Sequence, residues 1–138
     1  MDKKVILIAE DDPRVGESLG LLLKKKGHGI LLAPNGKEAL QVFRQEMVDL
    51  VITDLVMPKM DGIELLEAVK NLRPEAEVLV ISAQGTIEKA VQAMKLGAFD
   101  FIEKPINPRV ISLLVERALE KQTLIEGHGQ PGLAGGGN

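Results

Sequence analysis

The sequence contains no cysteine, no tryptophan and no tyrosine, and only three of its 138 residues are phenylalanine. Without cysteine, disulfide scaffolds, thiol catalysis and zinc ribbons are excluded. With so few aromatic side chains the core must be aliphatic, and there is no aromatic platform on which bases or sugars could stack. The lack of cysteine also agrees with a reducing, cytoplasmic environment.

Long hydrophobic runs and an excess of basic charge are missing too. The apolar runs, such as residues 5–9, are far shorter than the roughly 20 residues that span a bilayer. The sequence contains seventeen Lys and Arg and twenty Asp and Glu. The resulting net charge of -3 has the wrong sign for a domain that binds nucleic acid through its own surface. We therefore expect a soluble cytoplasmic protein that contacts neither a membrane nor nucleic acid directly.

Short β-branched runs alternate with segments of helical period, which indicates a parallel α/β fold. The predicted strands are residues 5–9, 30–32, 50–52, 78–81 and 99–102. The first, third and fourth are apolar without alternation, as expected for strands buried on both faces. The order is therefore (βα)5, in which right-handed crossovers put helices on both faces of one doubly wound parallel sheet.

Capping residues mark where the predicted helices begin. Asp12 is expected to cap the first helix, and the pairs Asn35–Glu38 and Asp61–Glu64 resemble capping boxes. Helical spacing also predicts the side of each helix that is buried. Residues expected on these buried sides include Met47, Leu72, Ile87, Val91 and Met94.

The length suits one domain, which we expect to cover residues 1–122. Six of the fourteen glycines fall in the last twelve residues. Residues 123–138 are therefore predicted to form a flexible, Gly-rich linker or an added tail.

Acidic residues follow the first and third predicted strands. Ligands of an open parallel sheet bind beyond the carboxyl ends of its strands, so Asp11, Asp12 and Asp54 should meet at one edge. Three carboxylates brought together repel one another, and a divalent cation would relieve that repulsion. Mg²⁺ is the natural candidate, because it accepts carboxylate oxygens and bridges to phosphate oxygens. Taken singly, Asp12 could simply cap its helix and the other two could be solvated strand ends.

A serine and a lysine follow the last two predicted strands. Lys104 would pair either with Asp54 or with an anion attached to it, and the peptide bond to Pro105 is a candidate for the cis form. The Ser82 hydroxyl could donate to a phosphoryl oxygen or cap a turn. Together these residues predict phosphoryl transfer to a carboxylate, with Asp54 as nucleophile and Lys104 and Ser82 holding the phosphoryl oxygens.

Four separated motifs occur in order at the predicted strand ends, and together they resemble the receiver domain of bacterial two-component response regulators. They are Glu10-Asp11-Asp12, Asp54-Leu55-Val56-Met57-Pro58 with Asp61-Gly62, Ser82-Ala83 and Lys104-Pro105. The resemblance covers about residues 3–121. It implies a flavodoxin-like strand order of 2-1-3-4-5. It also implies a signalling domain rather than an enzyme, although one that catalyses phosphoryl transfer to itself and its own dephosphorylation.

Carried over to this sequence, the resemblance implies that Asp54 accepts a phosphoryl group from the histidine of a sensor kinase. It implies that Asp11, Asp12 and Asp54 hold Mg²⁺ and that the backbone carbonyl of Val56 completes the protein ligands. The valine side chain is then free to vary.

The resemblance also implies which parts respond to phosphorylation. Ser82 and Phe101 match two positions whose side chains shift together, the hydroxyl moving to the phosphate and the ring turning inward. The region from Ser82 to Pro105 would change, and with it the face built from the fourth helix, fifth strand and fifth helix. Charged residues of this face could pair across a homodimer.

Residues 85–105 are similar, more narrowly, to receivers of the nitrogen-regulator type. Such receivers usually precede an ATPase domain that activates sigma-54 RNA polymerase and a domain that binds DNA. We therefore expect output domains of this kind in the full-length protein, with a free-standing regulator as the alternative.

Three other functions fit the sequence less well. A degenerate receiver could act as a docking module without phosphorylation, but such copies usually lose one of the motif residues. A haloacid-dehalogenase-type phosphatase normally carries a second acid two residues after its nucleophile, where this sequence has Val56. A nucleotide-binding domain would need a Gly-x-Gly-x-x-Gly turn after the first strand, where the sequence is acidic.

Overall fold

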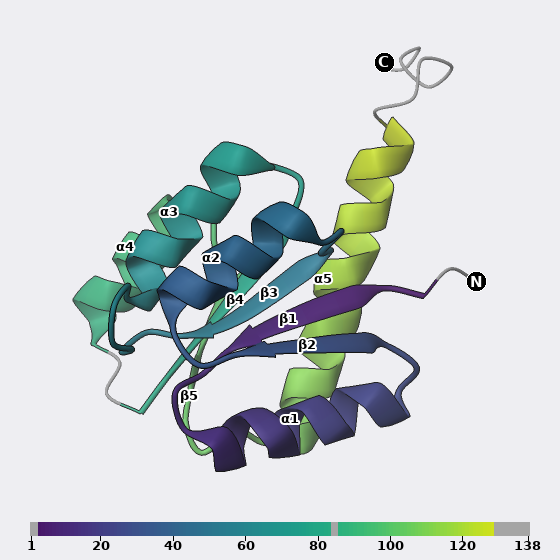
Figure 1. Cartoon of the computed structure of the whole chain (residues 1–138). Helices are drawn as coiled ribbons and strands as arrows, with labels where there is room; N and C mark the ends of the chain where they lie inside the picture. Colours follow the sequence, from purple (N-terminus) through teal and green to yellow (C-terminus); the bar gives the residue numbers. More distant parts are fainter. Residues whose placement is uncertain (1–2, 84–85, 129–138) are drawn as a thin grey trace.

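The computed structural model describes residues 3–83 and 86–128, and within them five strands alternate with five helices (Figure 1). The strands are β1 (Val5–Ala9), β2 (Gly29–Ala33), β3 (Leu50–Asp54), β4 (Glu77–Ser82) and β5 (Asp100–Glu103). The helices are α1 (Pro13–Lys25), α2 (Gly36–Gln45), α3 (Gly62–Leu72), α4 (Ile87–Lys95) and α5 (Pro108–His128). The predicted alternation is therefore confirmed.

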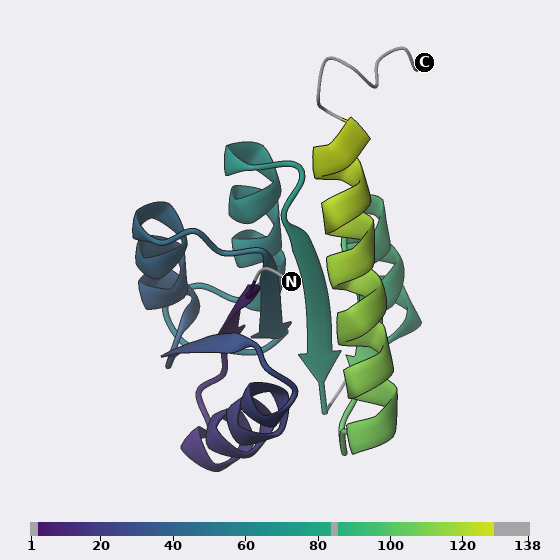
Figure 2. The same cartoon turned by 90° about the vertical axis from the view of Figure 1, so that its right-hand side faces the viewer.

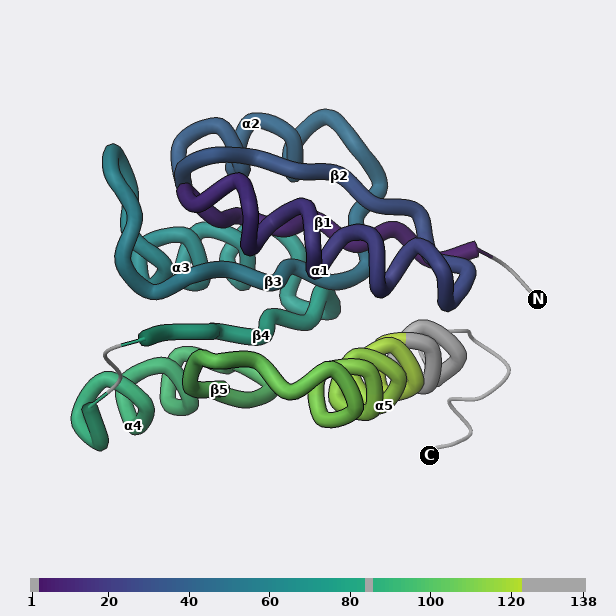
Figure 3. Tube along the Cα trace, turned by 90° about the horizontal axis from the view of Figure 1, so that it is seen from below, coloured from purple at the N-terminus to yellow at the C-terminus, as the bar shows by residue number. Residues whose placement is uncertain are grey.

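All neighbouring strands are parallel, and the sheet has the order β2-β1-β3-β4-β5, which can be followed from top to bottom in Figure 3. The predicted doubly wound order 2-1-3-4-5 is confirmed. Helices α1 and α5 cover one face of the sheet, and α2, α3 and α4 cover the other (Figures 1 and 2). The strand order reverses at β1 and β3, so the carboxyl ends of these two strands border the crevice in which such sheets bind ligands.

Two aliphatic layers hold the helices on the sheet. Every residue of β3 and β4 is buried, as the absence of alternation predicts. Along β4, Leu79 and Ile81 belong to the layer under α1 and α5, whereas Val78 and Val80 belong to the layer under α2 and α3. The middle of each central strand is therefore apolar, and polar side chains occur at the ends, with Glu77 at the amino end of β4 and Asp54 and Ser82 at the carboxyl ends of β3 and β4.

The helix starts follow the predicted capping residues, with one difference in detail. Asp61 and Glu64 form a reciprocal capping box. At α2, the Asn35 side chain accepts a hydrogen bond from the Glu38 N–H at 2.9 Å. The Glu38 carboxylate, however, accepts from the side-chain amide of Asn35 at 2.7 Å. This pair is therefore an N-cap with a side-chain bond in place of the second half of a capping box.

Helix α4 does not bury the stripe expected for it. Ile87 is 84% exposed, and Val91 and Met94 are each 46% exposed. Ala93 is the residue of α4 that is buried. The helix rests on the layer beside β5 through this small side chain, and the larger apolar side chains face outward. The prediction that Ile87, Val91 and Met94 are buried is therefore wrong.

Two further apolar residues expected in the core are exposed. Met47 lies two residues beyond the end of α2, and Leu72 is the last residue of α3. Helical spacing predicted that both are buried, but the buried side of each helix ends before it reaches them.

Helix α5 runs to His128 and so passes the boundary predicted at residue 122. Residues 129–138 of the predicted tail lie outside the described residues. Among the helices that the structure describes, none has the length and apolar character needed to cross a bilayer.

Candidate functional site

Three carboxylates meet at the carboxyl ends of two neighbouring strands. Glu10 and Asp11 follow β1, and Asp54 is the last residue of β3, which pairs with β1. One oxygen of each carboxylate lies within 4.8 Å of the others. Asp54 is only 6% exposed, so this residue stands at the floor of the cluster.

A single ammonium group joins the cluster from the other side of β4. Lys104 follows β5, and its Nζ lies 2.8 Å from Oε1 of Glu10 and 2.9 Å from Oδ2 of Asp54. The backbone N–H of Lys104 donates to the carbonyl of Ser82 at 2.8 Å, and the peptide bond to Pro105 is cis. The turn after β5 thus directs the lysine across the end of β4 to the acidic residues, as predicted from the sequence.

Burial and pairing shift the pKa values of two groups in the cluster. Burial raises the pKa of Glu10 above its ordinary value of 4.5, against the opposing hydrogen bonds from Lys104 and from the Asp12 N–H. Burial works against the charge on Lys104, but its hydrogen bonds to Glu10 and Asp54 outweigh burial and raise its pKa. One ammonium balances one of three carboxylates. A hard divalent cation that takes oxygen ligands, such as Mg²⁺, fits this donor set.

Asp12 is not part of this cluster, and the predicted trio of Asp11, Asp12 and Asp54 needs correction. The Asp12 side chain accepts the Arg14 N–H at 2.9 Å and so caps α1, and its other oxygen lies 3.5 Å from the Arg14 guanidinium. These hydrogen bonds lower the pKa of Asp12. Glu10 takes its place. The sequence contained a signal for this. Asp12 directly precedes a proline, and an aspartate before a proline at the start of a helix is typical of an N-cap, whose carboxylate binds backbone N–H groups.

The remaining predicted residues lie on β4, on β5 and directly after β3. Ser82 is the buried last residue of β4, the strand that pairs with β3. Phe101 is half-buried on β5 and packs against the core layer under α2 and α3. The backbone N–H of Val56 donates to Oδ1 of Asp54 at 3.3 Å, while the valine side chain is 64% exposed. Both oxygens of Asp54 therefore have partners.

A glycine fixes the backbone of Asp54. A Cβ atom on Gly62, at the start of α3, would collide with the carbonyl oxygen of Asp54. The N–H of Gly62 donates to the carbonyl of Leu55 at 2.8 Å. The close approach of α3 to the end of β3 requires glycine here, a role that the sequence motif alone did not reveal.

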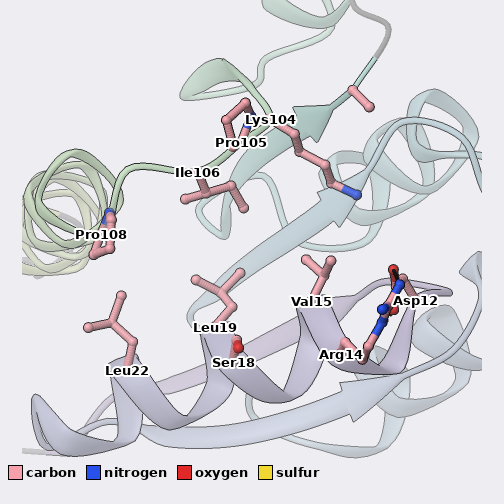
Figure 4. Close-up of a pocket in the computed structure, with 11 residues that line it drawn as sticks. Asp12, Arg14, Val15, Ser18, Leu19, Leu22, Lys104, Pro105, Ile106 and Pro108 are labelled. Carbon is pink, nitrogen blue, oxygen red and sulfur yellow. Dashed lines mark hydrogen bonds and ion pairs between the residues drawn. The ribbon is translucent and has the colours of Figure 1, made fainter.

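An apolar groove of about 830 Å³ opens beside Lys104 (Figure 4). One wall comes from α1 and the other from the turn between β5 and α5. The side chains facing each other across it are Val15, Leu19 and Leu22 on α1 and Pro105, Ile106 and Pro108 opposite. The groove thus offers an apolar surface that leads to the charged cluster.

Comparison with known proteins agrees with this arrangement. Residues 6–116 match the response regulator receiver domain family. The chain belongs to this family. Receiver domains are signalling domains, and the predicted resemblance is confirmed.

The relatives of this receiver domain include transcriptional regulators. GlrR of Escherichia coli K12 is 37% identical over 116 residues, which cover 84% of this chain and 26% of GlrR. NtrC of Azospirillum brasilense is 35% identical over 123 residues, covering 89% of this chain and 26% of NtrC. The crystal structure of NtrX from Brucella abortus has a TM-score of 0.85 at 34% identity over 91% of this chain and 29% of that one. The predicted likeness to the nitrogen-regulator type is confirmed. This receiver domain spans about a quarter of the length of the curated relatives that it matches.

Proposed function

We propose that this receiver domain is a phosphorylation switch in which Asp54 accepts a phosphoryl group from a sensor histidine kinase. The observation that carries the proposal is the setting of Asp54, an almost buried carboxylate held by Lys104 and close to Glu10 and Asp11. Its position at the end of β3, in the crevice of the sheet, leaves it open to a donor from one side.

The transfer would be a nucleophilic displacement at phosphorus. A carboxylate oxygen of Asp54 attacks the phosphorus of the kinase phosphohistidine, and the P–N bond breaks with its electron pair returning to the imidazole, which takes up a proton. Lys104, already 2.9 Å from Asp54, balances the added charge, and Ser82 donates its hydroxyl to a phosphoryl oxygen. Attack of water on the phosphorus later breaks the bond between the phosphorus and the Asp54 oxygen, which releases inorganic phosphate and restores the carboxylate.

Glu10, Asp11 and Asp54 would hold Mg²⁺, together with the backbone carbonyl of Val56. When bound, the ion supplies positive charge that neutralises the transferring group. The excess of carboxylates over ammonium groups in the cluster supports this assignment. Asp12 supports it indirectly, since its carboxylate is engaged in capping α1.

The phosphoryl group would act on the segment from Ser82 to Pro105. Lys104 links both ends of the response, because its ammonium contacts Asp54 while its N–H donates to the Ser82 carbonyl. Phe101 is half-buried and packs against the core, so its ring can become more buried if it turns inward when Ser82 moves. The surface formed by α4, β5 and α5 would change as a result, and this surface would be the output of the domain.

The groove beside Lys104 is the proposed docking surface for the kinase. Its apolar walls suit a helix of the kinase that carries the phosphohistidine, because one end of the groove lies next to the residue that pairs with Asp54. In the full-length protein, the domain would control an ATPase that activates sigma-54 RNA polymerase and a DNA-binding domain in the cytoplasm. The NtrC and NtrX relatives support this output.

The proposal is tested by the intact mass of the protein after incubation with Mg²⁺ and acetyl phosphate. We expect one added phosphoryl group, lost when EDTA is present and absent in Asp54→Asn. A lack of adduct, together with no response to beryllofluoride in the amide spectrum, would contradict the proposal and favour a docking module.

A further inference from the structure

Strand β2 forms an edge of the sheet that carries no charge. Its sequence is Gly29-Ile30-Leu31-Leu32-Ala33, whereas β5, at the opposite edge, includes Asp100 and Glu103. Proteins commonly protect an edge strand with charged residues or proline, since its unpaired backbone groups can bind another strand. The β2 edge lacks both protections within the strand.

The backbone of β2 shows which groups face outward. The Gly29 N–H donates to the Lys4 carbonyl at 2.8 Å, and the Ala33 carbonyl accepts from the Glu10 N–H at 3.0 Å. Alternate residues of a strand direct their backbone groups to the same side, so Leu31 also faces β1. The N–H and C=O groups of Ile30 and Leu32 therefore point away from the sheet.

Apolar side chains extend this edge on both faces of the sheet. Leu32 is 50% exposed, Leu21 of α1 is 58% exposed and Met47 is 80% exposed. They border a hollow of about 860 Å³ that follows β2 between α1 and the end of α2, which lie on opposite sides of this edge (Figure 2). Charged residues, among them Lys3 and Glu46, also line this hollow, so the exposed apolar side chains lie along an open edge with a charged rim. Exposed apolar side chains rimmed by polar residues are a feature of surfaces that bind other chains.

We propose that the β2 edge binds the β2 edge of a second copy of this chain in an antiparallel arrangement. With a two-fold axis at Leu31, Ile30 of each copy lies opposite Leu32 of the other. Because these residues carry the outward backbone groups, each of the two pairs can exchange two hydrogen bonds. Leu21 and Leu32 of both copies would then cover one another on the α1 side.

Charge favours a second copy over an unrelated strand. Glu17 and Lys24 are exposed residues of α1 that border the hollow. Glu17 lies near the carboxyl end of β2, next to Leu32 and Pro34, whereas Lys24 is in the last turn of α1, which leads to the amino end of β2. An antiparallel copy reverses these ends, so Glu17 of each copy approaches Lys24 of the other.

The first test combines sedimentation with amide hydrogen exchange on the full chain without a phosphodonor. We expect a concentration-dependent dimer and, with it, slower exchange at Ile30 and Leu32. The Leu31 amide, which faces β1, serves as the internal control and should not change. Exchange at Ile30 and Leu32 that is independent of concentration, or a protein that stays monomeric at millimolar concentration, would overturn the proposal.

Variants separate this surface from the one formed by α4, β5 and α5. Leu32→Lys should raise the dimer dissociation constant at least about tenfold, because it brings a charge into the apolar contact. Val110→Lys on α5, at a residue that is 45% exposed, is the matched control and should leave the dimer unchanged. The reverse pattern would refute the β2 interface.

A charge exchange tests the orientation without touching the strand. Glu17→Lys should weaken the dimer, because it places two lysines together at each end. Glu17→Lys combined with Lys24→Glu should restore the dimer, because residues 17 and 24 then again carry opposite charges at both contacts between the copies. Failure of the double variant to recover would exclude the antiparallel register.

Discussion

Lys104 and Asp54, fifty positions apart in the chain, are joined by an ion pair of 2.9 Å at the carboxyl ends of β5 and β3. The same ammonium lies 2.8 Å from Glu10, which is 1% exposed in its side chain. One lysine therefore neutralises part of a carboxylate cluster drawn from two other strands, and it occupies the place where an added phosphoryl group would need a counter-charge.

Lys104→Ala should leave Asp54 able to accept a phosphoryl group while removing the response to it. The variant should still gain mass with acetyl phosphate, but the exchange of amides in the Ser82–Pro105 segment should no longer change. Because Glu10 and Asp54 lose a hydrogen-bond donor, the free energy of unfolding without Mg²⁺ should fall by about 1–3 kcal/mol. Added Mg²⁺ should recover part of this loss. An unaltered amide response would contradict the role of Lys104.

The revised ligand set is tested by two neighbouring carboxylates. Asp11→Asn should weaken Mg²⁺ binding at least about tenfold, since it removes a charged oxygen ligand from the cluster. Asp12→Asn should leave Mg²⁺ affinity nearly unchanged and should keep α1 capped, because asparagine caps helices as well as aspartate does. Calorimetric titration with Mg²⁺ measures both. A larger loss in Asp12→Asn would restore the trio expected from the sequence.

Mg²⁺ binding should weaken as the pH falls toward 5. The pKa of Glu10 is raised above 4.5, mainly by burial, so this carboxylate takes up a proton at a higher pH than an ordinary glutamate and then no longer binds a cation well. For folding without metal the direction is opposite. A raised carboxyl pKa contributes stability below about 4.5, and that contribution is lost as the pH rises through the folded-state pKa. Titrations at pH 7.5, 6 and 5 with Glu10→Gln as control should show the pH dependence reduced in the variant.

Gly62→Ala should damage both stability and the site. Its Cβ would meet the carbonyl oxygen of Asp54, so α3 or the end of β3 must move, at a cost of about 1–3 kcal/mol in unfolding free energy. Gly16→Ala in α1 is the control, because its Cβ would find only ordinary contacts at 3.8 Å and alanine favours the helix by up to about 1 kcal/mol. Chemical denaturation measures both changes. Equal stability in the two variants would contradict the close approach of α3 to Asp54.

The sheet was predictable because its signals are local. The apolar runs of β1, β3 and β4 lack alternation, and the strand ends carry polar residues that the parallel topology gathers at one edge. Asp54, Ser82 and Lys104 were placed for this reason. The role of Glu10 was not predicted. Three acidic residues follow β1 in succession, and the sequence does not show which of them lie close to Asp54 and which one caps α1.

Burial of the helix faces was predicted less well. Periodicity indicates an apolar side but not how closely that side approaches the sheet. In α2 the apolar side is buried as far as Phe43, whereas in α4, which lies beside the edge strand β5, Ala93 is the buried residue. The Asp54–Gly62 contact depends on the tertiary approach of α3, which no local pattern encodes.

The sparse attachment of α4 has a thermodynamic consequence. A helix with one buried side chain should open locally at a lower free-energy cost than α3, which buries Ile63, Leu65, Leu66 and Val69. Its backbone amides should therefore exchange with solvent well before those of α3. A bias of about 1.4 kcal/mol, which alters the ratio of two states tenfold, is of the size that a few charge-assisted hydrogen bonds provide. The most easily opened helix thus lies within the segment that begins at Ser82 and ends beyond Lys104.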